Sequence, residues 1–224
     1  MVTAVLEASQ VGLTFGHQRA LDAVDLMVSP GSTVALVGRN GSGKTTLLRI
    51  VAGLLEPTHG VVLIDGHDPS SQRARAAVSY LPDSPIFFDD LGLEEHAELI
   101  GELHSDSRWQ PKFSALCRRF GLDDRRAGLP TQYSRGLKQK AALVLGLMRP
   151  HRLLLIDEPF VGLDRTGRRA LLDVIGHERT ANVTVVVATH EPAFLSQASH
   201  CVALKDGIVA YDGDPAGVDP DDLM

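Results

Sequence analysis

A glycine-rich segment, GRNGSGKTT at residues 38–46, carries the clearest chemistry in the sequence. It fits the pattern G-x-x-x-x-G-K-[ST], in which glycines let the backbone curl until its N–H groups converge on phosphate oxygens. An apolar run precedes it and a helical pattern follows it, so the start of that helix would add its positive dipole end to the same anion. Lys44 would hold the β- and γ-phosphates of a nucleotide, and Thr45 would bind magnesium. The residues expected to contact the nucleotide here are Gly38, Asn40, Gly41, Ser42, Gly43, Lys44, Thr45 and Thr46.

Two adjacent carboxylates end a second apolar run, LLLIDEP at residues 153–159. Ligands in open α/β sheets bind at the carboxyl ends of the strands, so Asp157 can reach the magnesium shell. Glu158 would point the other way along the strand, stand beside the γ-phosphate and polarise a water. A strand that ends in Asp-Glu is often only a solvated strand end, but the glycine loop in the same chain favours the catalytic interpretation.

A third apolar run, VVVATH at residues 185–190, ends in His190. An imidazole at the end of such a strand can touch the γ-phosphate. A lone histidine after a strand is usually a surface or capping residue, so the argument for His190 depends on its order and spacing relative to the other motifs.

The elements that must position these residues form an α/β pattern. Short β-rich runs alternate with helical patterns; they lie at 33–37, 60–66, 77–81, 152–157, 183–189 and 201–207. The runs at 152–157 and 183–189 are continuously apolar, as in parallel strands buried on both faces. The segments 4–15 and 20–28 alternate more and predict an N-terminal antiparallel β subdomain.

From about residue 84 to 148 the strand signal is absent, and helical segments follow one another at 93–104, 112–121 and 135–148. We therefore expect an α/β P-loop NTPase core with a mostly parallel sheet and an inserted helical lobe. The chain would form a single domain over residues 1–224, with its core in about 1–83 and 149–224 and the insertion in about 84–148.

Composition narrows the class of protein. The chain has 224 residues, 22 Lys plus Arg and 28 Asp plus Glu, for a net charge of −6, and no long basic stretch, so nucleic acid is not expected as a partner. Its longest apolar runs fall short of the roughly 18 residues that a membrane helix needs, and its N-terminus lacks the basic region of a signal peptide. Cys117 and Cys201 form no CxxC motif and suit packed thiols in a reducing compartment, and no zinc site is expected.

Together these residues resemble the ATP-binding cassette (ABC) ATPases, specifically the single-cassette subunits of membrane transporters, from about residue 4 to 213. GRNGSGKTT is similar to the Walker A motif, LLLIDEP to Walker B with Glu158 as catalytic base, VGLD at 161–164 to the D-loop with Asp164, and ATH to the switch histidine, His190. The resemblance implies a Mg²⁺-dependent ATPase with ATP and Mg²⁺ as cofactors. Phe15 falls where the family places an aromatic that stacks on adenine, although a core aromatic is the alternative.

Two motifs depart from the family pattern. The signature, usually LSGGQ, reads YSRGLKQK at 133–140, which keeps Ser134 and Gly136; Ser134 could also be a simple helix N-cap. The segment YLPD at 80–83 carries Asp83 where the family has glutamine, and this carboxylate could bind magnesium through water while adding charge that faces phosphate. These departures resemble exporter-like branches, so export is expected.

The resemblance also implies partners. Each ATP would be closed between the P-loop of one subunit and the signature of another, so a second copy or a paralogue is expected. A membrane-spanning permease would hold the chain on the cytoplasmic, inner face of the membrane. The segment SPIFFDDLGLEEH at 84–96 matches the family's groove for the permease, and of the adjacent Phe87 and Phe88 one should be exposed; packing of both in a turn is the alternative.

Other classes of protein fit less well. A GTPase would need an NKxD motif, but the only asparagines are Asn40 and Asn182, and lysine follows neither. Chromosome-organising cassettes are split by a coiled coil, and translation-type cassettes carry two copies with a basic linker. An ABC ATPase that regulates a membrane partner or has a soluble non-transport role stays as the alternative function.

Overall fold

The main sheet has six strands in the order β5-β6-β7-β3-β8-β9. The computed structural model describes residues 4–218. Residues 1–3 and 219–224, at the two ends of the predicted single domain, lie outside the described residues. The strands are β3 (Thr33–Val37), β5 (Val78–Leu81), β6 (Leu153–Asp157), β7 (Thr184–Ala188), β8 (His200–Lys205) and β9 (Ile208–Gly213). All neighbours pair in parallel except β8 and β9. The predicted mostly parallel sheet is therefore confirmed.

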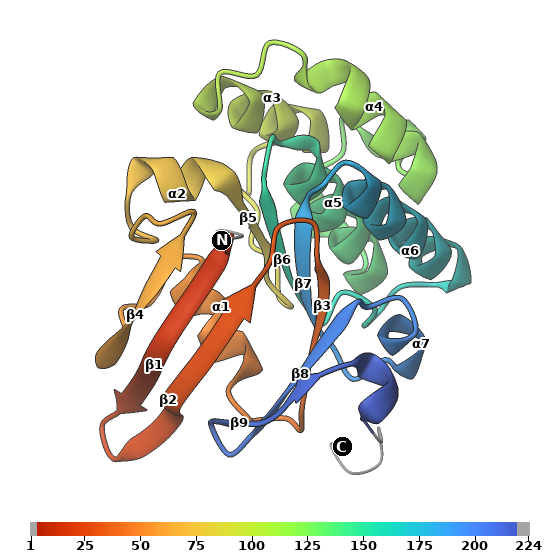
Figure 1. Ribbon diagram of the computed structural model, residues 1–224. Helices are drawn as coiled ribbons and strands as arrows, with labels where there is room; N and C mark the ends of the chain where they lie inside the picture. Colours follow the sequence, from red (N-terminus) through yellow and green to blue (C-terminus); the bar gives the residue numbers. More distant parts are fainter. Residues whose placement is uncertain (1–3, 219–224) are drawn as a thin grey trace.

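The segments 4–15 and 20–28 form a separate antiparallel sheet, as predicted, and the run at 60–66, whose sequence pattern groups it with the α/β strands, joins this sheet instead. Its order is β2-β1-β4, with β1 at Leu6–Phe15, β2 at Gln18–Val28 and β4 at His59–Ile64. Buried and exposed residues alternate along much of β2, because one face of this sheet covers the core. Figure 1 shows the antiparallel sheet beside one face of the main sheet, with α1 between them.

The helices include the four predicted helical segments, after the glycine loop and at 93–104, 112–121 and 135–148, and others at 72–77, 165–180 and 192–195 whose bounds were not predicted. In chain order the helices are α1 (Lys44–Val51), α2 (Gln72–Ala77), α3 (Leu93–Leu103), α4 (Trp109–Phe120), α5 (Arg135–Met148), α6 (Arg165–Thr180) and α7 (Pro192–Leu195). Three short 3-10 helices lie at Asp123–Arg125, Pro130–Gln132 and Pro215–Gly217. In Figure 1, α3 and α4 lie together at one end of the molecule, and α5 runs from them along the sheet.

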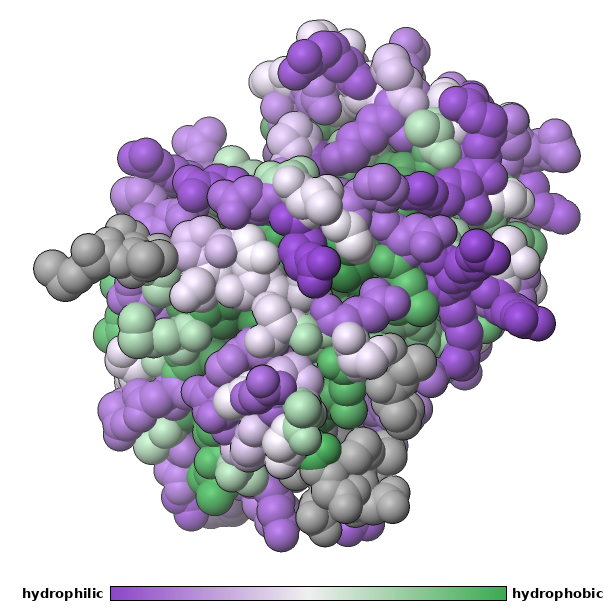
Figure 2. All heavy atoms as spheres, turned by 45° about the vertical axis from the view of Figure 1, so that its right-hand side comes forward, coloured by the Kyte–Doolittle hydropathy of each residue, from purple (hydrophilic) through white to green (hydrophobic). Residues whose placement is uncertain are grey.

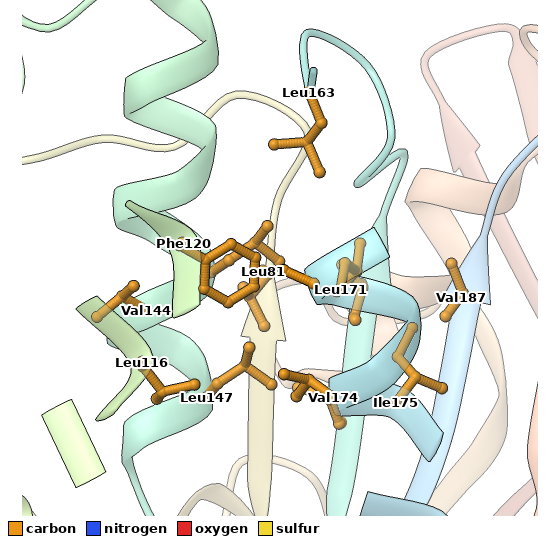
Figure 3. Packing of buried hydrophobic residues seen from close by; sticks show 14 of the residues in the cluster. Leu81, Leu116, Phe120, Val144, Leu147, Leu163, Leu171, Val174, Ile175 and Val187 are labelled. Atoms are coloured by element: carbon orange, nitrogen blue, oxygen red, sulfur yellow. The ribbon is translucent and has the colours of Figure 1, made fainter. Parts of the chain in front are cut away.

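Two apolar clusters enclose the main sheet. Strand β3 contributes Ala35 and Val37 to one cluster and Val34 and Leu36 to the other, because successive side chains point to opposite faces. The first cluster joins the sheet to α4, α5 and α6, where Phe120, Val144 and Leu171 meet (Figure 3). The sheet is thus held rigidly on both faces, which fixes the positions of its strand ends.

The described residues contain no helix long and apolar enough to cross a membrane. The face drawn in Figure 2 is mostly hydrophilic, with apolar side chains in separate patches. Cys117 and Cys201 are unpaired and buried, and burial raises the pKa of each thiol to about 11. The prediction of packed thiols is confirmed.

Candidate functional site

The glycine loop lies between β3 and α1, in the strand–loop–helix order that the sequence predicts. Gly38, Gly41 and Gly43 all have positive φ, at 145°, 85° and 106°. A Cβ on Gly43 would lie 2.8 Å from the Ala20 carbonyl oxygen, and one on Gly38 would collide with the Leu204 carbonyl. The backbone angle therefore favours glycine at all three positions, and lack of space also requires it at Gly38 and Gly43.

Lys44 is buried at the start of α1, with 6% of its surface exposed. Its ammonium donates hydrogen bonds to the carbonyls of Gly38 at 2.6 Å and Arg39 at 3.2 Å. Burial lowers the pKa of Lys44, while the charges of Glu158 and Asp157 counter that shift. A cation thus stands inside the loop, where it could exchange carbonyl partners for phosphate oxygens.

Asp157 ends β6 and is 1% exposed, and within residues 4–218 neither carboxylate oxygen has a hydrogen bond of normal geometry, although the Thr45 hydroxyl lies close to it. Burial raises the pKa of Asp157; the Thr45 hydroxyl lowers it, and the charges of Glu158 and Asp83 raise it further. A buried, unpartnered carboxylate is costly unless another group compensates it.

A magnesium ion fits this arrangement. Mg²⁺ takes oxygen ligands, and Asp157 and Thr45 offer a carboxylate and a hydroxyl side by side. Within the described part of the chain, no group of three or more His, Cys, Asp or Glu side chains could hold a metal alone. The remaining ligands would have to come from nucleotide phosphate and water, as is usual for Mg²⁺.

Glu158 and His190 form a pair at the ends of adjacent strands. Glu158 Oε2 lies 2.9 Å from His190 Nδ1, and the Glu158 side chain is 16% exposed against 57% for His190. Glu158 has φ of 44°, a conformation that costs about 1–3 kcal/mol in a non-glycine residue. Its N–H bonds to the Ala188 carbonyl at 2.8 Å, so β7 holds this strained turn. The result is an oriented carboxylate that can accept a proton from water.

Asp83 follows β5 and is exposed. Its charge raises the pKa of both Asp157 and Tyr80, so it lies in the same electrostatic neighbourhood. Its one hydrogen bond within the described residues comes from the Ser84 hydroxyl, at 3.4 Å. The carboxylate is therefore free to face an ion or water at this edge of the sheet.

Phe15 is 52% exposed at the end of β1, which rules out the core-aromatic alternative. An exposed ring at a hairpin end offers a flat apolar face for stacking.

A second set of predicted nucleotide-contacting residues lies at the starts of α5 and α6 and consists of Ser134, Gly136 and Asp164. Ser134 accepts a hydrogen bond from the Leu137 N–H at 3.4 Å and so caps α5, as the alternative interpretation predicts. A Cβ on Gly136 would lie 2.6 Å from the Gly162 carbonyl. Asp164 caps α6 and pairs with Lys140 at 2.9 Å. No hydrogen bond or ion pair in residues 4–218 joins the side chain of Ser134 or Asp164 to Lys44, Asp157 or Glu158.

Phe87 and Phe88 line a groove of about 390 Å³ between β5, α3 and α5. Phe87 packs partly buried against the core, and Phe88 is 59% exposed, so the prediction that one of them is exposed is confirmed. The buried His96 holds this rim: its Nε2 accepts from the Phe88 N–H at 2.9 Å, and its Nδ1 lies 2.8 Å from the Gly92 carbonyl.

Sequence reasoning missed Tyr80 and Gly207. Burial and the charge of Asp157 raise the pKa of Tyr80, and its ring also lines the groove. Gly207 donates its N–H to the Ser42 carbonyl in the glycine loop. A tyrosine in YLPD and an Asp-Gly turn carry no chemical signal of their own, so only the fold brings them to the site.

Comparison with known proteins agrees with this geometry. The family model of ABC transporters matches residues 21–161. The ABC-type transporter ATP-binding protein EcsA of Bacillus subtilis (strain 168) is 31% identical over 186 residues, which cover 80% of this chain and 74% of the relative. A solved ATP-binding subunit of an ABC transporter is 30% identical with a TM-score of 0.91, covering 98% of this chain and 97% of that one. An ATP-binding cassette solved as a post-hydrolysis dimer with ADP and Pi has a TM-score of 0.85, covering 95% of this chain and 100% of that one. Because its sequence is only 23% identical, this likeness shows the shared fold alone.

Proposed function

This chain belongs to the ABC transporter family and is an ATP-binding ATPase, and from that premise we propose that it powers a membrane transporter by Mg²⁺-dependent hydrolysis at the Lys44–Asp157–Glu158 site. The observation that carries the proposal is the pair of Glu158 and His190, 2.9 Å apart beside a buried lysine and an uncompensated aspartate. This arrangement supplies a base, an anion site and an ion site at one edge of a rigid sheet.

In the proposed mechanism, Lys44 and the N–H groups of the glycine loop bind and orient the phosphates. Asp157 and Thr45 would hold Mg²⁺, which supplies positive charge against the phosphate oxygens when bound. Glu158 accepts the proton of the attacking water, and His190 orients that carboxylate and contacts the γ-phosphate. Phe15 stacks on adenine, and Asp83 reaches the ion through water.

The complete site needs a second chain. Ser134 and Gly136 start α5, a helix of 14 residues whose N–H groups and dipole favour an anion, and Asp164 lies beside them across the Lys140 ion pair. The Ser134 hydroxyl accepts the cap bond and keeps its own proton to donate to phosphate. We propose that this group closes over the nucleotide of a partner subunit, either a second copy or a paralogue.

The groove at Phe87 and Phe88 is the proposed seat of the membrane-spanning permease. The exposed ring stands beside Asp89 and Asp90, so an apolar segment with basic neighbours would complement it. In this proposal the single domain consists of a core of about 1–83 and 149–224 and a helical insertion of about 84–148. Docking on the permease would place the chain on the cytoplasmic, inner face of the membrane.

Export is the proposed direction, supported by Arg135 in the signature and by Asp83, both of which resemble exporter-like branches. Inside-out vesicles that hold the chain with its permease should accumulate solute from a cell metabolite extract when MgATP is added outside. Depletion of preloaded vesicles would indicate import, and no ATP-dependent movement would favour the regulatory or soluble alternative.

The hydrolytic part of the proposal is tested by Glu158→Gln, since an amide fills the same space but cannot act as a base. Phosphate release should fall by roughly 10²–10⁴-fold while the Kd for ATP changes little. Glu98→Gln, an exposed change on α3, is the matched control. Normal turnover in the Glu158 variant would remove this residue from the catalytic role.

A further inference from the structure

Gly207 lies in the turn between β8 and β9, more than 160 residues beyond the glycine loop in sequence but against it in space. Its N–H donates to the Ser42 carbonyl at 3.1 Å, and its own carbonyl accepts from the Asp22 N–H at 2.8 Å. One residue thus connects the loop, the antiparallel sheet and the last hairpin, whose position under α1 and β2 is visible in Figure 1.

The bond to Ser42 determines where a neighbouring donor points. In a planar trans peptide, the carbonyl of one residue and the N–H of the next point in opposite directions. Because Gly207 holds the Ser42 carbonyl, the Gly43 N–H of the same peptide unit points away from the β8–β9 turn. Lys44, the next residue, donates its ammonium to the Gly38 and Arg39 carbonyls of the same loop.

Only glycine can occupy this position. Gly207 has φ of 82°, and an added Cβ would lie 2.8 Å from the Ala20 carbonyl oxygen and 3.1 Å from the Leu21 Cα. Both contacts are to backbone, which cannot rotate away as a side chain can. Any larger residue would therefore push the turn off the loop and lengthen the bond to Ser42.

We propose that Gly207 is a positioning residue for nucleotide binding: through the Ser42 carbonyl it aims the Gly43 N–H at the phosphate. The inference rests on the proposed nucleotide site. It implies that the β8–β9 hairpin determines affinity for nucleotide phosphate without touching the nucleotide, because a preorganised donor binds without a further cost of ordering.

The test compares Gly207→Ala with Gly66→Ala in the full chain. Gly66 has φ of 75° and open space around its Cβ position, so its substitution carries the same backbone strain without displacing a neighbour. The Kd for MgADP should rise roughly tenfold or more in Gly207→Ala, the effect of losing one donor to a charged group. Gly66→Ala should lower the melting temperature of the free protein and leave that Kd unchanged.

Gly207→Asn separates displacement from strain, because asparagine tolerates positive φ but also carries a Cβ. It should weaken MgADP binding as much as Gly207→Ala does. Wild-type affinity in both variants, or a loss that Gly66→Ala shares, would overturn the inference. Failure of the wild-type protein itself to bind MgADP would instead contradict the proposed function.

Hydrogen exchange on the unmodified chain gives a second measurement if the variants do not fold. The Gly207 amide should be protected from exchange although it lies in a turn, and MgADP should increase that protection. Exchange as fast as that of the Gly66 amide, with or without nucleotide, would also overturn the inference.

Discussion

Asp157 shows how a single residue can favour function over stability. Asp157 is 1% exposed, its carboxylate has no hydrogen bond of normal geometry among the described residues, and its pKa is raised mainly by burial. A raised pKa means that the folded state retains the proton better than the unfolded state. The contribution of Asp157 to stability therefore falls as pH rises from its ordinary value of 3.8 through the raised value.

Asp157→Asn should consequently stabilise the free protein at neutral pH while weakening its response to MgATP. Relief of about 1 kcal/mol would raise the melting temperature by roughly 2–4 °C in a chain of this size. The gain should shrink as pH falls toward 3.8, where the wild-type carboxyl is also neutral. Thermal melts across pH, with and without MgATP and with EDTA, measure both effects; Asp173→Asn on the exposed face of α6 is the control.

Lys44→Ala tests the anion site directly. Removal of one charged donor to phosphate should cost about 1.5–3 kcal/mol, or roughly ten- to a hundredfold in ATP affinity. Titration calorimetry measures the change, and Lys112→Ala on the surface of α4 is the matched control. Unchanged affinity would contradict the assignment of the loop to nucleotide binding.

Asp83 is proposed to act through the magnesium shell in place of glutamine. Asp83→Gln should then retain substantial turnover, because an amide oxygen can still face bound water, whereas Asp83→Ala should lose it. Phosphate release measures turnover. Equal rates in the wild type and both variants would show that Asp83 has no role in hydrolysis and only begins the loop after β5.

At the scale of elements, periodicity predicted most strands and the longer helices of residues 84–148, but it gave no bounds for α6 or β9 and did not predict the packing between elements. The helix over 135–148 was predicted to its ends, since Ser134 is a good N-cap and an Arg-Pro pair follows Met148. Helix α4 begins earlier than predicted, at Trp109, because that indole packs 5.8 Å from Phe113 and leaves no room for a Cβ on Gly101. Such contacts between helices leave no local pattern in a sequence.

Phe87→Ser with Phe88→Ser should release the protein from washed membranes that contain its permease, because truncating such an anchor costs about 2 kcal/mol or more of docking energy. ATP affinity should stay intact, since the nucleotide loop lies on other elements. Met27→Ser, which removes an exposed apolar side chain on β2 outside both the groove and the nucleotide site, controls for surface hydrophobicity. Retention at the wild-type level would contradict a docking role.

At the scale of the whole molecule, the sequence predicted which strand ends carry chemistry but not how they meet. Lys44, Asp157 and Glu158 could be named because glycine spacing and apolar runs before carboxylates are local signals. The pairing of Glu158 with His190 depends on β6 lying beside β7, and the link from Gly207 to Ser42 depends on β8 lying beside β3. These adjacencies follow from topology, which periodicity does not encode.

The central claim is that two chains close around ATP and that Glu158 then starts hydrolysis. The most direct measurement is the size of Glu158→Gln on a sizing column with MgATP and with MgADP. A variant that binds ATP but cannot hydrolyse it should elute as a dimer with MgATP and as a monomer with MgADP. A monomer under both conditions, together with normal phosphate release, would contradict the claim.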